Sequence, residues 1–133
     1  MQVTLRDLVV SQSALSELCG QKGSAKMTYT LALVLNAVRP HLEAYQKAVE
    51  VLQEKYFIPD EKNKEVLRVD PSKRDVFRQE SDEILAQEVN LPIGKIRFTV
   101  FAAENLDINA INLSLLQWLI KEDDAETFFE ATS

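Results

Sequence analysis

A heptad pattern of apolar residues is the feature that most constrains this sequence. From Leu31 to Tyr56 the apolar residues recur at alternating steps of four and three, the spacing of a long helix that packs against another helix. They are Leu31, Leu35, Val38, Leu42, Tyr45, Val49, Leu52 and Tyr56. We call this face the seam. It contains no reactive group, so it predicts packing within the molecule or binding to another protein.

Pro40 lies in the middle of the seam. A proline has no N–H to bond the carbonyl of Asn36, and its ring crowds that carbonyl, so a straight uninterrupted helix is excluded. The predicted helix begins after its cap Ser24 and runs to about Phe57. Either it is kinked near Pro40, or it breaks there and Pro40 starts a new helix. The seam keeps its phase through Pro40, which favours the kink.

A shorter helix is predicted ahead of the seam. Thr4 can cap it, and Asp7 completes an acidic variant of the capping box. Apolar residues then recur with helical spacing until Gly20 supplies a stop. We therefore expect one helix from about residue 5 to residue 19.

The second half of the chain is predicted to form two strands and two helices. Residues 65–69 form a short strand, and Asp70-Pro71 opens a helix that reaches Val89. Residues 95–101 alternate as a half-buried strand should and are expected to pair with residues 65–69. Asp107 or Asn109 caps a last helix whose apolar face extends to Ile120, with Trp118 partly off that face.

These elements predict an α+β fold that is predominantly α. A long kinked central helix packs against two to three shorter helices, with a small two-stranded β element. We expect one helical domain over residues 1–120, the ordinary size of a single domain, followed by an acidic C-terminal tail over residues 121–133.

Composition excludes several classes of function. The chain holds 15 Lys and Arg against 21 Asp and Glu, and a net charge of −6 repels nucleic acids and anionic lipids. No apolar stretch approaches the roughly 20 residues of a membrane span, and no secretory signal is apparent. Cys19 is the single cysteine, which excludes an intramolecular disulfide. We expect a cytoplasmic protein that binds neither nucleic acid nor membrane.

No residue pattern predicts catalysis, a cofactor or a metal site, so we expect no enzymatic activity. His41 is the single histidine, and Glu43 faces elsewhere on the helix. Residues 20–26 resemble a phosphate loop only superficially, because their glycines have the wrong spacing. The carboxylates of residues 75–88 fit the solvated face of an amphipathic helix better than an acid–base pair.

Two segments are candidates for binding another protein. The first is the seam beyond Pro40, where the spacing is most regular; packing within the molecule is the simpler explanation for most of the seam. The second is the C-terminal tail, where two aromatic rings in an acidic context resemble a docking segment for a basic surface. A tail without a role is the alternative. The candidate residues are Leu42, Tyr45, Val49, Leu52, Tyr56, Glu122, Asp123, Asp124, Phe128 and Phe129.

The order of elements over residues 27–120 resembles a group of small phage and prophage proteins. The matching residues are Leu42, Tyr45, Val49, Leu52, Lys55-Tyr56, Asp60-Glu61, Glu80, Ile84-Leu85, Glu88-Val89, Ile96, Leu115, Leu116 and Leu119. Pro40 departs from the continuous helix of that pattern. The resemblance implies a phage-encoded accessory protein without known catalytic residues, in the cytoplasm of the host. The acidic residues after Asp60 predict a basic protein as its partner, such as a host defence enzyme that it inhibits. The alternative is a structural or assembly component that forms a homodimer through the seam.

Overall fold

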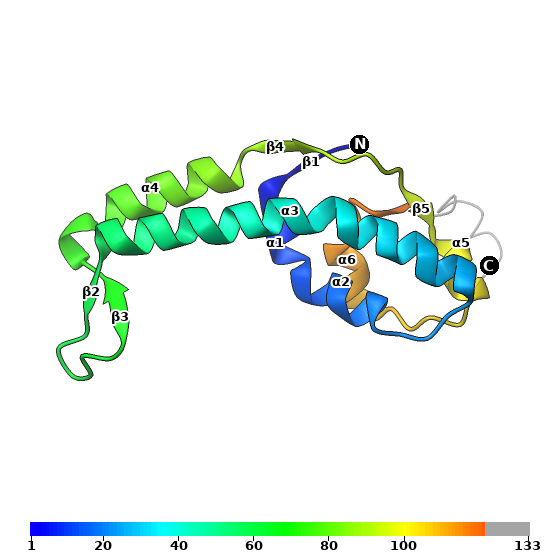
Figure 1. The fold of residues 1–133 in the computed structure, drawn as a ribbon, viewed down its shortest axis with the longest axis horizontal. Helices are drawn as coiled ribbons and strands as arrows, with labels where there is room; N and C mark the ends of the chain where they lie inside the picture. Colours follow the sequence, from blue (N-terminus) through cyan, green and yellow to red (C-terminus); the bar gives the residue numbers. More distant parts are fainter. Residues whose placement is uncertain (122–133) are drawn as a thin grey trace, which may run out of the picture.

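The long helix α3 (Ala25–Tyr56) connects the two parts of this protein, as the computed structural model shows for residues 1–121. Ser24 caps it as predicted, because the Ser24 hydroxyl accepts a hydrogen bond from the N–H of Met27 at 3.1 Å. α3 continues through Pro40 with a gentle curve (Figure 1), so the alternative of a break at Pro40 is wrong. One end of α3 lies in a cluster of short helices, which we call the head. The other end forms an arm that projects from the head.

The N-terminal part of the head contains two helices where the sequence predicted one. α1 (Leu5–Val10) and α2 (Gln12–Cys19) are separated at Ser11, so the prediction of a single helix over residues 5–19 is wrong. The Ser11 hydroxyl donates to the carbonyl of Asp7 at 2.6 Å and accepts a hydrogen bond from Trp118. Such a side-chain bond competes with the helical backbone. The Thr4–Asp7 capping box at the start of α1 is confirmed.

The remaining head elements come from the last quarter of the described chain. They are β5 (Ile96–Arg97), α5 (Phe98–Ala103), α6 (Ala110–Leu115) and β6 (Ile120–Lys121). The predicted strand over residues 95–101 is wrong beyond Arg97, because a helical turn places Phe101 fully inside the core. Asn109 caps α6 as expected, but the helix ends at Leu115, and Trp118 is buried where the sequence placed it partly off the face.

The arm consists of the part of α3 after Pro40, a β-hairpin and α4 (Arg74–Leu85). The hairpin pairs β2 (Phe57–Pro59) with β3 (Leu67–Val69) in antiparallel register, so the predicted pairing of residues 65–69 with residues 95–101 is wrong. A 3-10 turn (Pro71–Lys73) precedes α4, and Asp70 caps it as expected. The sequence allowed one pair of strands, whereas residues 1–121 contain three.

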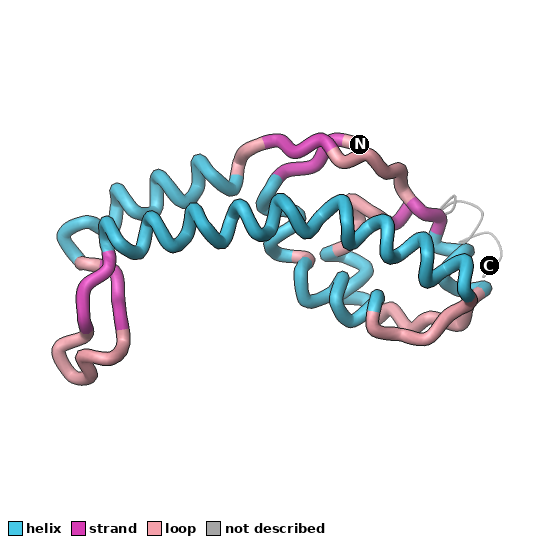
Figure 2. Tube along the Cα trace, viewed as in Figure 1, coloured by secondary structure: helices cyan, strands magenta, loops and turns pink. Residues whose placement is uncertain are grey.

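α4 ends four residues earlier than predicted. Val89 belongs to β4 (Glu88–Asn90), which pairs antiparallel with β1 (Gln2–Thr4) and returns the chain from the arm to the head. An ion pair of 3.6 Å between Arg6 and Asp82 joins α1 to α4. The predominantly helical α+β class with a long central helix is confirmed, and Figure 2 shows how little of the described chain is strand.

The hydrophobic core lies in the head. Five of its side chains are at most 2% exposed: Leu8, Leu18, Val38, Phe101 and Leu116. Val38 belongs to the first half of the seam. Over residues 41–85, which form the arm, Leu52 is the one buried side chain. The first half of the seam is therefore internal packing, while the second half has few contacts to cover it.

A carboxylate joins the start of α3 to the end of α5. Glu104 accepts hydrogen bonds from the backbone N–H of Ser24 at 2.9 Å and from the Ser24 hydroxyl at 2.7 Å. These bonds favour the ionised form and lower the pKa of Glu104.

A lowered pKa in the folded state contributes stability that is present above the ordinary pKa of 4.5 and is lost as the pH falls through the lowered value. We therefore expect Glu104→Gln to lower the melting temperature at pH 7. This difference from the wild type should be smaller at pH 3. Thermal unfolding at the two pH values checks the prediction, and an equal difference at both would contradict it.

Candidate protein-interaction face

Five apolar residues of α3 beyond Pro40 form the first part of the candidate site. We call them the distal seam: Leu42, Tyr45, Val49, Leu52 and Tyr56. α4 packs along one side of this stretch, and it covers Leu52 best, leaving it 6% exposed. The other four side chains are only half-buried. Leu42 and Tyr45 pack at the edge of the head core beside α2, and Tyr56 packs against Phe77 of α4, none of whose own side chains is buried. The structure thus leaves an apolar stripe partly open along the arm.

A groove between α2 and α3 continues this stripe into the head. It has a volume of about 700 Å³ and includes Leu42 and Tyr45 of the distal seam. α2 supplies its second wall through Leu15 and Cys19, which lie four residues apart and so face the same way. We call it the α2–α3 groove. Its edge on α3 carries Arg39, Glu43 and Gln46.

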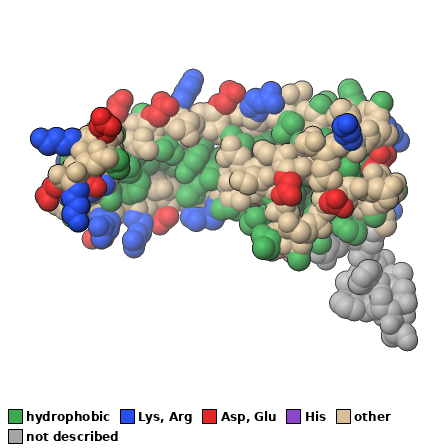
Figure 3. All heavy atoms as spheres, turned by 90° about the horizontal axis from the view of Figure 1, so that it is seen from below, with side chains coloured by type: hydrophobic (Ala, Val, Ile, Leu, Met, Phe, Trp, Pro, Cys, Tyr) green, Lys and Arg blue, Asp and Glu red, His purple; other side chains and the backbone are tan. Residues whose placement is uncertain are grey.

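The underside of the arm carries apolar surface as well. Seen from below, hydrophobic side chains gather along the arm between its charged tip and the head (Figure 3). An apolar stripe beside a groove and edged by polar side chains is typical of a surface that binds another protein. Sequence reasoning identified the distal seam but missed the wall from α2. The four-residue spacing of Leu15 and Cys19 was the signal for it.

Aromatic contacts hold the tip of the arm. Phe77 of α4 contacts the rings of Tyr56 and Phe57 edge to face, with centroids 6.4 Å and 5.3 Å away. These contacts connect the end of α3 and the start of the hairpin to α4. The end of the distal seam is therefore fixed in position before any partner binds.

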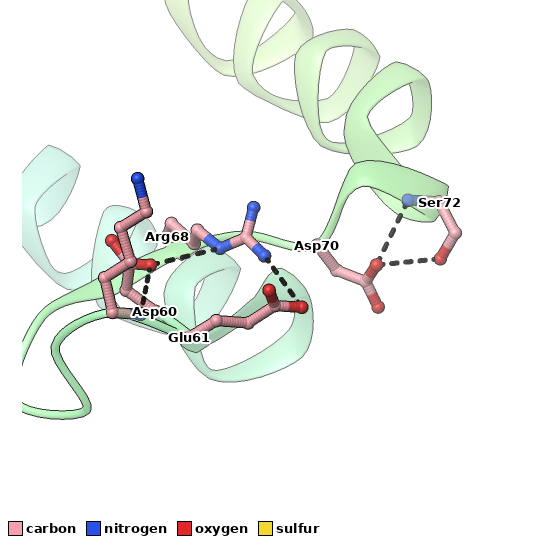
Figure 4. A network of polar contacts seen from close by, with 6 residues as sticks. Asp60, Glu61, Arg68, Asp70 and Ser72 are labelled. Carbon is pink, nitrogen blue, oxygen red and sulfur yellow. Dashed lines mark hydrogen bonds and ion pairs between the residues drawn. The ribbon is translucent and has the colours of Figure 1, made fainter.

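Charged residues organise the base of the hairpin (Figure 4). Arg68 lies 4.0 Å from a carboxylate oxygen of Asp60 and 3.9 Å from one of Glu61. Asp70 accepts hydrogen bonds from the N–H and the hydroxyl of Ser72, which lower the pKa of Asp70. The Arg68 pairs thus lie within the hairpin, and the Asp70–Ser72 bonds hold the turn that leads into α4. Both have a structural role.

The carboxylates of α4 divide into two groups. Asp75, Asp82 and Glu83 are exposed, as expected for the solvated face of an amphipathic helix. Glu80 instead points inward, where it lies beside the Tyr56 hydroxyl and raises the pKa of Tyr56. One oxygen of Glu80 is buried without a hydrogen-bond partner in residues 1–121.

The other residues considered for chemistry lie apart from one another. Burial raises the pKa of the Cys19 thiol to about 11, so at neutral pH it is the unreactive thiol. His41 is half-exposed at the edge of the distal seam. Over residues 1–121 no group of three or more His, Cys, Asp and Glu side chains is placed to hold a metal ion. Residues 20–24 connect α2 to α3, as the spacing of the glycines suggested.

The acidic candidates lie outside the described residues. These are Glu122, Asp123, Asp124, Phe128 and Phe129. All 15 Lys and Arg precede residue 122, together with 16 of the 21 Asp and Glu. The head and arm are therefore nearly neutral together, and the excess of acidic residues belongs to residues 122–133.

In the described part of the chain, no helix is both long enough and apolar enough to cross a membrane. No protein-family model matches this sequence, and neither a curated protein nor a solved structure matches it.

Proposed function

We propose that this protein is a non-catalytic protein-binding factor whose distal seam and α2–α3 groove bury a helix of a protein partner. The observation that supports this most is the contrast along α3. Its first half is buried in the head, with Leu31 and Val38 at most 4% exposed, whereas its second half carries the same apolar spacing with only one buried residue. A helix laid along such a stripe would bury it.

The resemblance to phage and prophage proteins supports an accessory role for this binding factor, in the cytoplasm of a host cell. The acidic tail favours one form of this role, in which the protein inhibits a host enzyme by occupying a basic cleft of that enzyme. The tail would then select the partner by charge, while the distal seam provides apolar contacts. Complementary potentials speed encounter and reject wrong partners.

Val49 and Val51 provide a matched test of the distal seam. Val49 lies on the half-buried stripe, whereas Val51 is 49% exposed and faces the cleft between α3 and α4. We expect Val49→Glu to abolish retention of the partner in affinity purification from the native host, because it places a charge in an apolar contact. Val51→Glu should retain it. Equal retention by both folded variants would contradict the proposal.

The tail has a separate expected effect. Replacing Glu122, Asp123 and Asp124 with lysine should weaken binding to a basic partner by about tenfold or more at low salt. The loss should shrink as salt is added, because exposed charges are screened. Titration of the purified partner at two salt concentrations measures this. If the affinity at low salt is unchanged, the tail takes no part in binding this partner.

A structural or assembly component that self-associates through the distal seam is the second candidate function. The half-buried side chains of the distal seam, which a second copy could cover, are the observation that favours it.

A further inference from the structure

The first half of α3 carries an exposed face on the side away from the head core. Tyr29 is 66% exposed and Leu33 is 44% exposed, and the two lie one helical turn apart. Lys26 and Asn36 are exposed on the same face, three residues before Tyr29 and three residues after Leu33. We call these four residues the outer face of α3. Two large apolar side chains thus lie open beside a lysine.

The charge around the outer face is opposite to that of the tail. Residues 18–42, which include this face, contain three Lys and Arg and no Asp or Glu. Outside the arm, residues 1–40 and 88–121 hold seven Lys and Arg against five Asp and Glu. Residues 122–133 of the tail hold five Asp and Glu and no Lys or Arg. The head therefore attracts the tail that is attached to it.

The strand that precedes the tail is aimed toward the start of α3. β6 runs parallel to β5, so the chain leaves Lys121 in the direction in which β5 leads into α5. The end of α5 lies at the start of α3, where Glu104 accepts two hydrogen bonds from Ser24 (Figure 1). These bonds also take up the carboxylate of Glu104, the acidic side chain at this end of α3.

The tail is long enough to reach the outer face. Neighbouring strands lie about 5 Å apart, the helical route from Arg97 to Glu104 measures about 10 Å, and Tyr29 lies about 8 Å beyond Ser24 along α3. Residues 122–129 extend up to about 28 Å. Because α3 runs back from this end of the head toward the arm, the direct distance is shorter than the route (Figure 1).

We propose that the tail docks on the outer face of α3, with its two phenylalanine rings against Tyr29 and Leu33 and its carboxylates beside Lys26. The rings provide the apolar anchors of this contact. The charges favour the head over the arm, where Asp and Glu outnumber Lys and Arg. A basic partner then has to displace the tail from α3. This goes beyond the proposed function, because docking occurs in the protein without its partner.

Disulfide trapping tests the position of the tail. In a Cys19→Ser background of the full chain, Ala131→Cys is combined either with Asn36→Cys on the outer face or with Thr28→Cys. Thr28 is also exposed, but it lies on another side of α3 and nearer to the start of the helix. A tail without a preferred position would therefore reach Thr28 at least as readily.

We expect the pair at Asn36 to form a disulfide at least about tenfold faster under mild oxidation, because docking raises the effective concentration of the two thiols. The rate is measured from the mobility of the product on a non-reducing gel. Replacing Phe128 and Phe129 with alanine should remove the preference for Asn36 over Thr28. Equal rates for the two pairs in the presence of both rings would overturn the proposal.

Two matched pairs of variants test the contacts on the outer face. Leu33→Glu should remove the trapping preference, whereas Leu67→Glu should keep it, because that leucine is 55% exposed on the hairpin of the arm. Lys26→Glu should likewise weaken trapping at low salt, and Lys64→Glu, an exposed lysine of the hairpin, is its control. An equal loss in both members of a pair would show an effect of net charge alone and overturn the outer face as the docking site.

The trapped product also shows whose tail is docked. We expect a disulfide within one chain, whereas a disulfide-linked dimer would overturn docking of the tail on its own α3. The outcomes separate this inference from the proposed function. Absence of the trapping preference, with partner binding still lost in Val49→Glu, overturns docking alone. A clear preference, with equal partner retention by Val49→Glu and Val51→Glu, supports docking and overturns the proposed function.

Discussion

Trp118→Ala is expected to lower the free energy of unfolding by about 3–5 kcal/mol, the usual cost of removing a buried aromatic side chain. Trp118 is only 8% exposed, and its Nε1–H donates a hydrogen bond of 2.9 Å to the hydroxyl of Ser11. Ser11 is itself fully buried and separates α1 from α2. The alanine variant therefore loses apolar contact in the core and the bond that fixes the break between the two helices. Denaturant unfolding followed by circular dichroism measures the loss.

Trp118→Phe and Ser11→Ala separate these two contributions. The phenylalanine variant keeps most of the ring but removes the donor, and the alanine variant at Ser11 leaves the buried indole N–H without a partner. Each is expected to cost about 1–3 kcal/mol. The double variant should cost less than the sum, since both changes remove the same bond. A loss below 1 kcal/mol for Trp118→Ala would contradict the core position of this side chain.

Pro40→Ala is expected to raise the free energy of unfolding by up to about 3 kcal/mol. α3 runs through Pro40 as one helix, and the side chain is exposed, so alanine loses no buried contact there. The new N–H can bond the carbonyl of Asn36, and the crowding by the proline ring disappears. Thermal and denaturant unfolding of the two proteins check the sign of the change.

The neighbouring substitution His41→Ala serves as the control for Pro40. It changes helix propensity by less than about 1 kcal/mol and leaves the backbone hydrogen bonds in place. If Pro40→Ala instead lowers stability, the curve of α3 is required to pack against the head and α4 at once.

Local signals in the sequence predicted where the long helix and its neighbours begin. Thr4, Ser24, Asp70 and Asn109 each cap a helical segment, because a side-chain oxygen accepts a backbone N–H within three residues. Such bonds need only neighbouring residues, so they can be recognised in a sequence. The same holds for the apolar stripe of α3, whose periodicity follows from the helix itself.

Residues 96–101 show why local patterns fail elsewhere. Their alternation fits a strand, yet only Ile96 and Arg97 pair, with β6, and Phe101 enters the core on a helical turn. Alternating residues are compatible with both structures over so short a stretch. The partner strand and the space for Phe101 decide between them, and both are distant in the sequence.

The candidate site divides in the same way. The distal seam could be predicted, because its five residues lie on one helix. For the groove, the sequence offered only the spacing of Leu15 and Cys19 on α2. Whether that wall faces α3 depends on how the connection after Cys19 folds back.

The sequence by itself determined the helical character of this protein, the ends of its long helix and the stripe along it. These follow from hydrogen bonds and side-chain spacing within a few residues. Only the tertiary structure decided which half of the stripe is core, how the strands pair, and that Ser11 divides the first helix. Those outcomes depend on contacts such as Ser11 with Trp118, 107 residues apart, which form only when the whole head packs together.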